Sequence, residues 1–157
     1  MIKLYTIALA LLCAAFSAIA QPDPYADSTV ITKHAVTING ANIPYTATIG
    51  TQPVWDADGK VIAAINFTYY ERSDIKSKSN RPLVISFNGG PGSASLWMEI
   101  GYTGPRILTL DDEGYPVQPY GEMRDNPHSI LDVADVVYVN PVNTGYSRIL
   151  DKKVDKN

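Results

Sequence analysis

Cysteine is almost absent from this sequence. Cys13 is the single cysteine among 157 residues, and it lies in an apolar segment near the N-terminus. An intrachain disulfide is therefore excluded, and the fold must rely on its hydrophobic core. The length and composition suit one globular domain with such a core, because 45% of the residues are hydrophobic and only 18% are charged.

Positive charge is also scarce. The 13 Lys and Arg residues are outnumbered by 16 Asp and Glu residues, which gives a net charge of −3, and the basic residues are scattered along the chain. A protein that binds nucleic acid through its phosphates needs a concentration of positive charge. The composition therefore excludes nucleic acid as an expected partner, and it leaves the oligomeric state open.

No apolar run reaches the ~20 residues that a membrane-spanning helix needs. The apolar run at residues 4–16 follows the positive charge of Lys3 and is followed by Ala18-Ile19-Ala20. This order is typical of a secretory signal peptide that is cleaved after a small residue. A buried N-terminal helix is the alternative, but such a helix would normally show a polar face.

We therefore predict that residues 1–20 are a signal peptide and that residues 21–157 are one exported domain. The mature chain is expected to be periplasmic or extracellular, without stable membrane insertion after cleavage. Cleavage would also remove the only cysteine.

Turn residues divide the next part of the chain into strands. Residues 29–49 have the pattern of a hairpin around Asn39-Gly40, a pair that favours a type I′ turn. Residues 54–70 repeat this pattern around Asp58-Gly59. Asn66-Phe67-Thr68 matches a glycosylation acceptor, but its place inside a strand indicates a chance match.

Two short, mostly apolar runs follow, at residues 83–87 and 133–139. The first suits a central strand that is buried on both faces, and a short helix is predicted after it at residues 96–100. Antiparallel strands followed by strand–loop–helix units predict an α/β fold with antiparallel opening strands on a mostly parallel sheet.

The loop Asn88-Gly89-Gly90-Pro91-Gly92-Ser93 is the most informative segment. It follows a predicted strand at the carboxyl end, where ligands bind in open α/β sheets. Glycine permits positive φ and close approach of a ligand to backbone N–H groups, and Pro91 stiffens the loop. These are the features of an oxyanion hole.

Two other interpretations of this loop remain. A P-loop needs Lys after its last glycine, and a dinucleotide-binding loop needs G-x-G-x-x-G, and neither is present. We therefore expect no cofactor. A tight turn without a ligand is the second alternative, which glycine spacing alone leaves open.

Residues 88–95 closely resemble the Asn-Gly-Gly-Pro-Gly-Cys/Ser-x-Ser motif of the serine carboxypeptidases, peptidase family S10. Residues 137–147 resemble that family's later strand and its Pro-Val-Gly-Thr-Gly-Phe/Tyr-Ser loop. Gly104-Pro105 and Asn126-Pro127 occupy matching places between the two motifs. The resemblance spans residues 82–148, and two motifs in the right order are more specific than either alone.

The resemblance implies an α/β-hydrolase fold and a Ser-Asp-His triad that releases C-terminal residues from peptides. At the matching positions, Gly90 would donate an oxyanion-hole N–H, and Asn88 with the Gly89 backbone would bind the substrate's terminal carboxylate. An amide and backbone N–H groups can satisfy a carboxylate without a lysine. The implied partner is a peptide with a free C-terminal carboxylate.

The sequence departs from the family pattern at three positions. Ser93 stands where many members have a disulfide-bonded cysteine, which resembles bacterial members of the family. Asn140 replaces a common acidic residue, and Asn143 replaces a glycine. The last two departures allow a shift in substrate.

The sequence lacks the nucleophile motif G-x-S-x-G of α/β-hydrolases. Ser93 and Ser95 lie in the Gly-rich loop instead. The triad order is Ser, Asp, His, so His34 and His128 both precede the expected serine and are interpreted as surface or structural residues.

We therefore predict that the chain is the incomplete N-terminal part of a serine-type carboxypeptidase and that it has no peptidase activity alone. A non-catalytic exported binding protein and an acyltransferase on the same scaffold are the alternatives.

Overall fold

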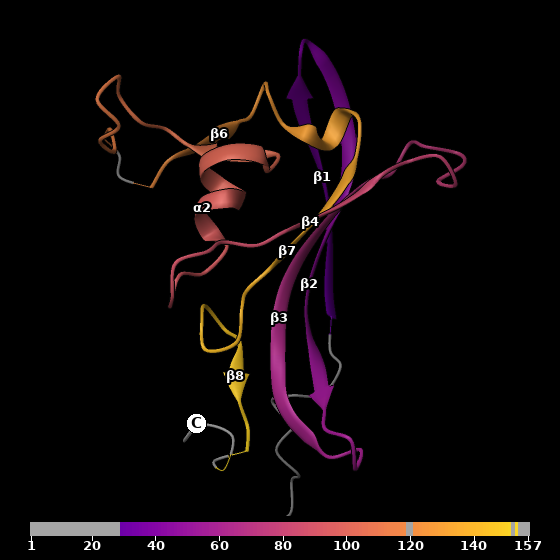
Figure 1. Cartoon of the computed structure of the whole chain (residues 1–157). Helices are drawn as coiled ribbons and strands as arrows, with labels where there is room; N and C mark the ends of the chain where they lie inside the picture. The colour runs from indigo at the N-terminus through magenta and orange to yellow at the C-terminus, as the bar shows by residue number, and fades with distance from the viewer. Residues whose placement is uncertain (1–28, 119–120, 152, 154–157) are drawn as a thin grey trace, which may run out of the picture.

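The computed structural model describes residues 29–118, 121–151 and 153 (Figure 1). Within these ranges the chain forms a six-stranded mixed sheet and a two-stranded sheet, with few helical residues. The strands of the large sheet lie in the order β1 (Thr29–Ile38), β2 (Ala41–Trp55), β3 (Val61–Arg72), β7 (Asp135–Val139) and β4 (Leu83–Ser86), and β8 (Arg148–Ile149) pairs with β3 outside this path. The predicted signal peptide lies outside the described residues. None of the helices described in these ranges is long and apolar enough to cross a membrane.

The first three strands form an antiparallel meander, as predicted. They are β1 (Thr29–Ile38), β2 (Ala41–Trp55) and β3 (Val61–Arg72). Asn39 and Gly40 join β1 to β2 with φ angles of 48° and 81°, so both residues have the positive φ that a type I′ turn needs. Because β2 continues to Trp55, the two predicted hairpins share one long strand.

The prediction of a mostly parallel sheet is wrong for the described residues. β4 (Leu83–Ser86) and β7 (Asp135–Val139) form the one parallel pair there, while β3 pairs with β7 in the antiparallel direction. Connectivity explains the difference. Tight turns join β1 to β2 and β2 to β3, and neighbours joined in this way must be antiparallel, whereas only the long connection from β4 to β7 is a crossover.

This connection covers one face of the large sheet. It contains α2 (Leu96–Met98), the π-helical turn η1 (Glu99–Thr103), β5 (Arg106–Leu108), β6 (Met123–Asp125) and the 3₁₀ turn η2 (Ile130–Asp132). In Figure 1, α2 and β6 lie to the left of the large sheet. The helix predicted at residues 96–100 is confirmed, and its helical turns continue to Thr103. Leu131 of η2 completes a buried cluster with Val36, Ile38, Ile43, Tyr45 and Ala47.

β4 forms one edge of the sheet, and its side chains are not buried. Leu83, Ile85 and Phe87 are 57%, 63% and 65% exposed. The prediction that residues 83–87 are buried on both faces is therefore wrong for the described residues. The alternation of the strand places these three side chains on the face opposite Val84, and that face has no cover among the described segments.

A buried ion pair fixes the beginnings of β4 and β7. Arg81 and Asp135 have side chains that are only 8% and 7% exposed, and Nε of Arg81 lies 2.7 Å from Oδ1 of Asp135. The guanidinium also donates to carbonyl oxygens within residues 131–134, and Oδ1 of Asp135 accepts from the backbone N–H of Arg72. The pair therefore ties β3, β4 and η2 to the strand β7.

A carboxyl group and three tyrosines form a cluster between η1 and the sheet. The rings of Tyr45, Tyr70 and Tyr138 follow one another edge to face, with centroids 5.8 and 6.0 Å apart. Tyr70 donates its hydroxyl to Oε1 of Glu99 at 2.7 Å. Burial raises the pKa of the Glu99 carboxyl above its usual value, and the hydrogen bond from Tyr70 offsets part of that rise.

We predict that Glu99→Gln stabilises the protein at neutral pH. A raised pKa means that the folded state holds the proton more tightly than the unfolded state, whose pKa is near 4.5. Below the unfolded pKa the carboxyl is protonated in both states, and the cost of burying a carboxylate is absent. Above the folded pKa that cost is fully present. The free energy of unfolding therefore falls as pH rises from the unfolded pKa to the folded pKa. Glutamine keeps the accepting oxygen without the charge.

Thermal unfolding measured against pH tests this prediction. The midpoint of Glu99→Gln should exceed that of the wild type at neutral pH, and the two should converge at acid pH. Glu113→Gln, in an exposed turn, is the control and should match the wild type throughout. A difference for Glu99→Gln that stays constant with pH would contradict the argument.

Candidate functional site

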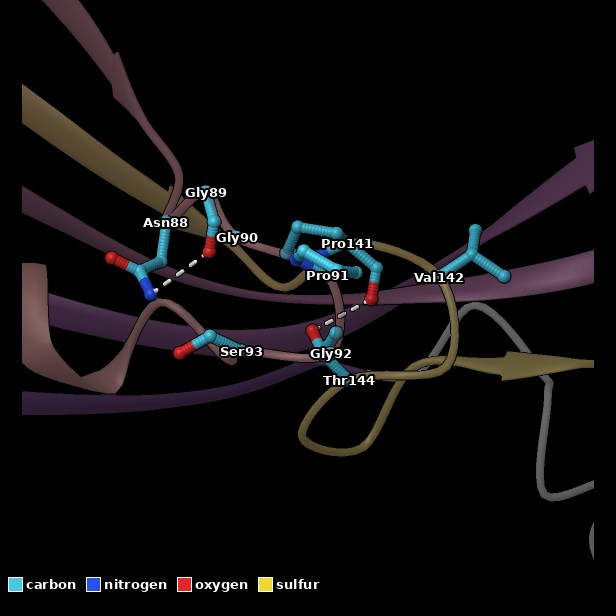
Figure 2. Close-up of a pocket in the computed structure, with 9 residues that line it drawn as sticks. All are labelled: Asn88, Gly89, Gly90, Pro91, Gly92, Ser93, Pro141, Val142 and Thr144. Carbon is cyan, nitrogen blue, oxygen red and sulfur yellow. Dashed lines mark hydrogen bonds between the residues drawn. The ribbon is translucent and has the colours of Figure 1, made fainter.

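The two sequence motifs meet in one pocket. The glycine loop (residues 88–93) follows β4, and the second loop (residues 141–147) follows β7. Because β4 and β7 are parallel neighbours, both loops leave the sheet at the same edge. They form an open pocket of about 380 Å³, lined by Asn88, Gly89, Gly90, Pro91, Gly92, Ser93, Pro141, Val142 and Thr144. Figure 2 shows these lining residues on the two loops.

The backbone of the glycine loop is open to this pocket. Gly90 and Gly92 have φ angles of 66° and 88°, a conformation that favours glycine. A Cβ atom placed on Gly89, Gly90 or Gly92 would meet no atom within 4 Å. Among the described residues, neither the N–H of Gly89 nor that of Gly90 has a hydrogen-bond acceptor. The loop therefore leaves backbone donors without a protein acceptor at the wall of the pocket, which is a feature that an oxyanion hole requires.

Asn88 presents a side-chain amide beside these donors. Its backbone N–H donates to Oγ of Ser95 at 3.1 Å, which fixes the residue. Its side-chain Nδ2 lies 3.4 Å from the carbonyl oxygen of Gly89, longer than an ordinary N–H···O bond (Figure 2). The amide is therefore available to a ligand. The three predicted site residues, Asn88, Gly89 and Gly90, are adjacent on the pocket wall.

Ser95 has a structural place in the glycine-loop motif. It is 1% exposed, its hydroxyl donates to the carbonyl oxygen of Val139, and its backbone N–H donates to Oδ1 of Asn140 at 2.9 Å. A hydroxyl that is buried and engaged in this way is not free to attack a substrate. Ser93, by contrast, lines the pocket.

The hydrogen bonds among the polar residues beneath the loops were not predicted from the sequence. Asn140 contacts both Ser95 and Asn66, and Ser147, which is fully buried, accepts from the backbone N–H of Asn66. Asn66 is 8% exposed and donates to the carbonyl oxygen of Gly50, so its side chain is not a glycosylation acceptor in this fold. A polar amide in a strand of apolar neighbours was the one available indication.

The second loop accommodates its departures from the family pattern. Asn143 has a φ of 65°, in the left-handed region that asparagine adopts more readily than most residues do. Its Oδ1 accepts from the backbone N–H of Ile149 at 3.3 Å. Thr144 donates its hydroxyl to the carbonyl oxygen of Pro141 at 2.7 Å, which closes the loop (Figure 2).

Neither histidine lies at the pocket. His34 is exposed on β1 and stacks on Tyr45 with the ring centroids 5.4 Å apart, and His128 is exposed after Pro127. Both are surface residues, as predicted. Of the residues that the structure describes, none that lines the pocket is charged. Within the described ranges, no group of three or more His, Cys, Asp and Glu residues is arranged to hold a metal ion.

Comparison with known proteins relates this arrangement to one family. The family model described as serine carboxypeptidase matches residues 60–157. The chain is 37% identical over 83 residues to carboxypeptidase Y homolog A of Leptosphaeria maculans, and 38% identical over 80 residues to carboxypeptidase Y of Schizosaccharomyces pombe. These matches cover 50% and 48% of this chain but only 12% and 7% of those fungal proteins.

One part of a larger solved structure has a similar fold. Kex1Δp, a prohormone-processing carboxypeptidase from Saccharomyces cerevisiae, superposes with a TM-score of 0.51 at 24% sequence identity. The superposition covers 73% of this chain and 22% of that one. The chain therefore has the fold of one part of that larger structure, and it spans a small fraction of the length of these relatives.

Proposed function

The chain belongs to the serine carboxypeptidase family, and from this membership we propose that it forms the oxyanion-hole and carboxylate-binding part of an enzyme that releases C-terminal residues from peptides. The observation that carries the proposal is the pocket itself. Two motifs far apart in the sequence meet there. Within the described part of the chain, they offer a side-chain amide and backbone donors that have no acceptor, and they bring no charged side chain to the pocket.

Each proposed role follows from the chemistry of the group. The N–H of Gly90 would donate to the oxyanion that develops when a nucleophile attacks the scissile carbonyl. Asn88 and the backbone of Gly89 would donate to the terminal carboxylate of the peptide, since hydrogen bonds to a charged acceptor are stronger than neutral ones. Together they would place the last peptide bond beside the glycine loop. The Ser-Asp-His triad would come from other parts of the complete protein.

Two further features belong to the proposal. The N-terminal segment would direct the protein to the periplasm or outside the cell, with residues 1–20 removed. Ser93 in place of a disulfide-forming cysteine would place the chain with the bacterial members of the family.

A pair of blocked dipeptides tests the function in the complete protein. One has a free C-terminal carboxylate and the other a C-terminal amide. We expect release of the last residue from the free acid only, with loss of activity after treatment with a serine-directed inhibitor. Covalent labelling by the inhibitor without hydrolysis, together with transfer from an activated ester to an amine, would favour the acyltransferase. Absence of both labelling and turnover would favour a binding protein.

Asn88→Ala is expected to raise KM for the free-acid dipeptide about 10- to 100-fold, with little change in kcat, because one hydrogen bond to a charged group is worth about 1.5–3 kcal/mol. The backbone N–H to Ser95 is retained, so the loop should keep its shape. Steady-state kinetics give both constants. Asn42→Ala, an exposed amide on β2, is the control. A fall in kcat at unchanged KM would instead assign Asn88 to the chemical step.

A further inference from the structure

A directed chain of hydrogen bonds links the glycine loop to the centre of the sheet. The backbone N–H of Ser95 donates to Oδ1 of Asn140 at 2.9 Å, and Nδ2 of Asn140 donates to Oδ1 of Asn66 at 2.9 Å. Nδ2 of Asn66 then donates to the carbonyl oxygen of Gly50 in β2 at 3.0 Å. Asn140 is the member that joins the exit of the glycine loop to the beginning of the second loop.

The orientation of both amides is determined by their partners. A backbone N–H can only donate, so the atom of Asn140 that faces Ser95 must be its oxygen. A carbonyl oxygen can only accept, so the atom of Asn66 that faces Gly50 must be its nitrogen. The remaining contact joins the nitrogen of Asn140 to the oxygen of Asn66. Reversing either amide would place like atoms against each other at two contacts.

The backbone of Asn140 is held as firmly as its side chain. Its N–H donates to the carbonyl oxygen of Asn66 at 3.0 Å, and its carbonyl oxygen accepts from Oγ of Ser147 at 2.7 Å. Gly145 lies against the side chain, because a Cβ atom there would come within 2.8 Å of Nδ2 of Asn140. The absence of a side chain at Gly145 therefore leaves room for this amide.

We propose that Asn140 is a positioning residue that holds the glycine loop in register with the second loop, and that an amide at this position makes the link independent of pH. Among the described residues, the hydrogen-bond partners of the Asn140 side chain are Ser95 and Asn66, and Gly145 lies against it; none of the three is titratable. A carboxylate in its place would still accept from Ser95. Its second oxygen would face Oδ1 of Asn66 with no hydrogen between the two atoms. Only a protonated carboxyl group could donate a hydrogen bond there.

Asn140→Asp in the complete protein tests this inference, which for the kinetic readout rests on the proposed carboxypeptidase function. We expect kcat on the free-acid dipeptide to fall about 100-fold at neutral pH, because a small misplacement of the glycine loop has an effect of that order. The ratio of variant to wild-type kcat should recover as pH falls toward about 3.9, where an aspartate takes up its proton. The catalytic groups titrate in both proteins, so their effect on kcat cancels in this ratio.

Three variants sharpen the result. Asn143→Asp makes the same change three positions away. The Asn143 side chain accepts a hydrogen bond from the backbone N–H of Ile149, and a carboxylate can accept it equally well, so this variant should behave as the wild type. Asn140→Ala should lose activity without recovery at acid pH. Asn66→Ala removes the opposing oxygen, so Asn140→Asp should cost less in that background than in the wild type. A ratio for Asn140→Asp that stays near one, or that is reduced equally at every pH, would overturn the proposal.

Hydrogen exchange separates this inference from the proposed function. If the complete protein shows no peptidase activity, exchange of the Ser95 amide hydrogen still reports the link. Asn140→Ala should accelerate that exchange at least tenfold, and Asn143→Asp should leave it unchanged. Unchanged exchange at Ser95 in Asn140→Ala would overturn the positioning role, whatever the activity of the protein.

Discussion

Arg81→Met is expected to lower the free energy of unfolding by about 3–5 kcal/mol, since removing one partner of a buried ion pair leaves the other charge without compensation. Asp135 is 7% exposed on its side chain, so its carboxylate would keep only the backbone N–H of Arg72 as a partner. The carbonyl oxygens within residues 131–134 would lose their donors as well. Methionine has an aliphatic stem of similar length, so the decrease in the free energy of unfolding can be assigned to removal of the guanidinium group.

Urea denaturation followed by circular dichroism gives this free energy. Arg106→Met is the matched control, because Arg106 also pairs with an aspartate and donates to a backbone carbonyl, but the side chains of its pair are 45% and 37% exposed. An exposed pair of this kind contributes about 0–1 kcal/mol. Equal losses for the two variants would show that burial of the Arg81 pair has no special effect. The double variant Arg81→Met with Asp135→Asn should recover part of the loss.

Gly90→Ala is expected to reduce kcat about 100- to 1000-fold, the effect of losing one oxyanion-hole donor. Gly90 lines the pocket and has a φ of 66°, and a Cβ atom placed there would meet no protein atom within 4 Å. Alanine is strained at this φ, so the backbone would relax and turn the N–H away from the position of the oxyanion. The cost to stability should be only about 1–2 kcal/mol, the usual penalty for a left-handed alanine.

The same change at Gly59 separates strain from chemistry. Gly59 has a φ of 77° in the turn between β2 and β3, and a Cβ atom there also meets nothing within 4 Å. Gly59→Ala should therefore lose similar stability while keeping full activity. Kinetics and thermal unfolding of both variants would show the contrast. Retention of normal kcat in Gly90→Ala would remove Gly90 from the proposed oxyanion hole.

Local chemistry made part of this fold predictable. Asn39-Gly40 defines a tight turn through the conformational preferences of two residues, and the glycine loop was recognisable because few other sequences permit its backbone. Both features depend on residues that are adjacent in the chain. The meander and the adjacency of Asn88, Gly89 and Gly90 on the pocket wall followed from them.

Features that depend on distant residues were not predictable. The exposure of β4 depends on what covers it, and the apolar run at residues 83–87 contains no information about its neighbours. The amide chain through Asn66 and Asn140 joins residues far apart in sequence, and neither segment alone indicates that the two side chains meet. The short strand β8 depends on pairing with Ala63 and Ala64 of β3, so two residues alone did not indicate it.

The pairing of β4 with β7 has a consequence for the order in which the molecule folds. β1, β2 and β3 are neighbours in the chain, so their contacts close short loops, whereas Val84 and Val136 meet only after the whole connection has been brought back to the sheet. Closing a longer loop has a larger entropic cost, and contacts of this kind tend to form later. We therefore expect the hairpins to form early during synthesis and the pocket to be among the last parts of the chain to take shape.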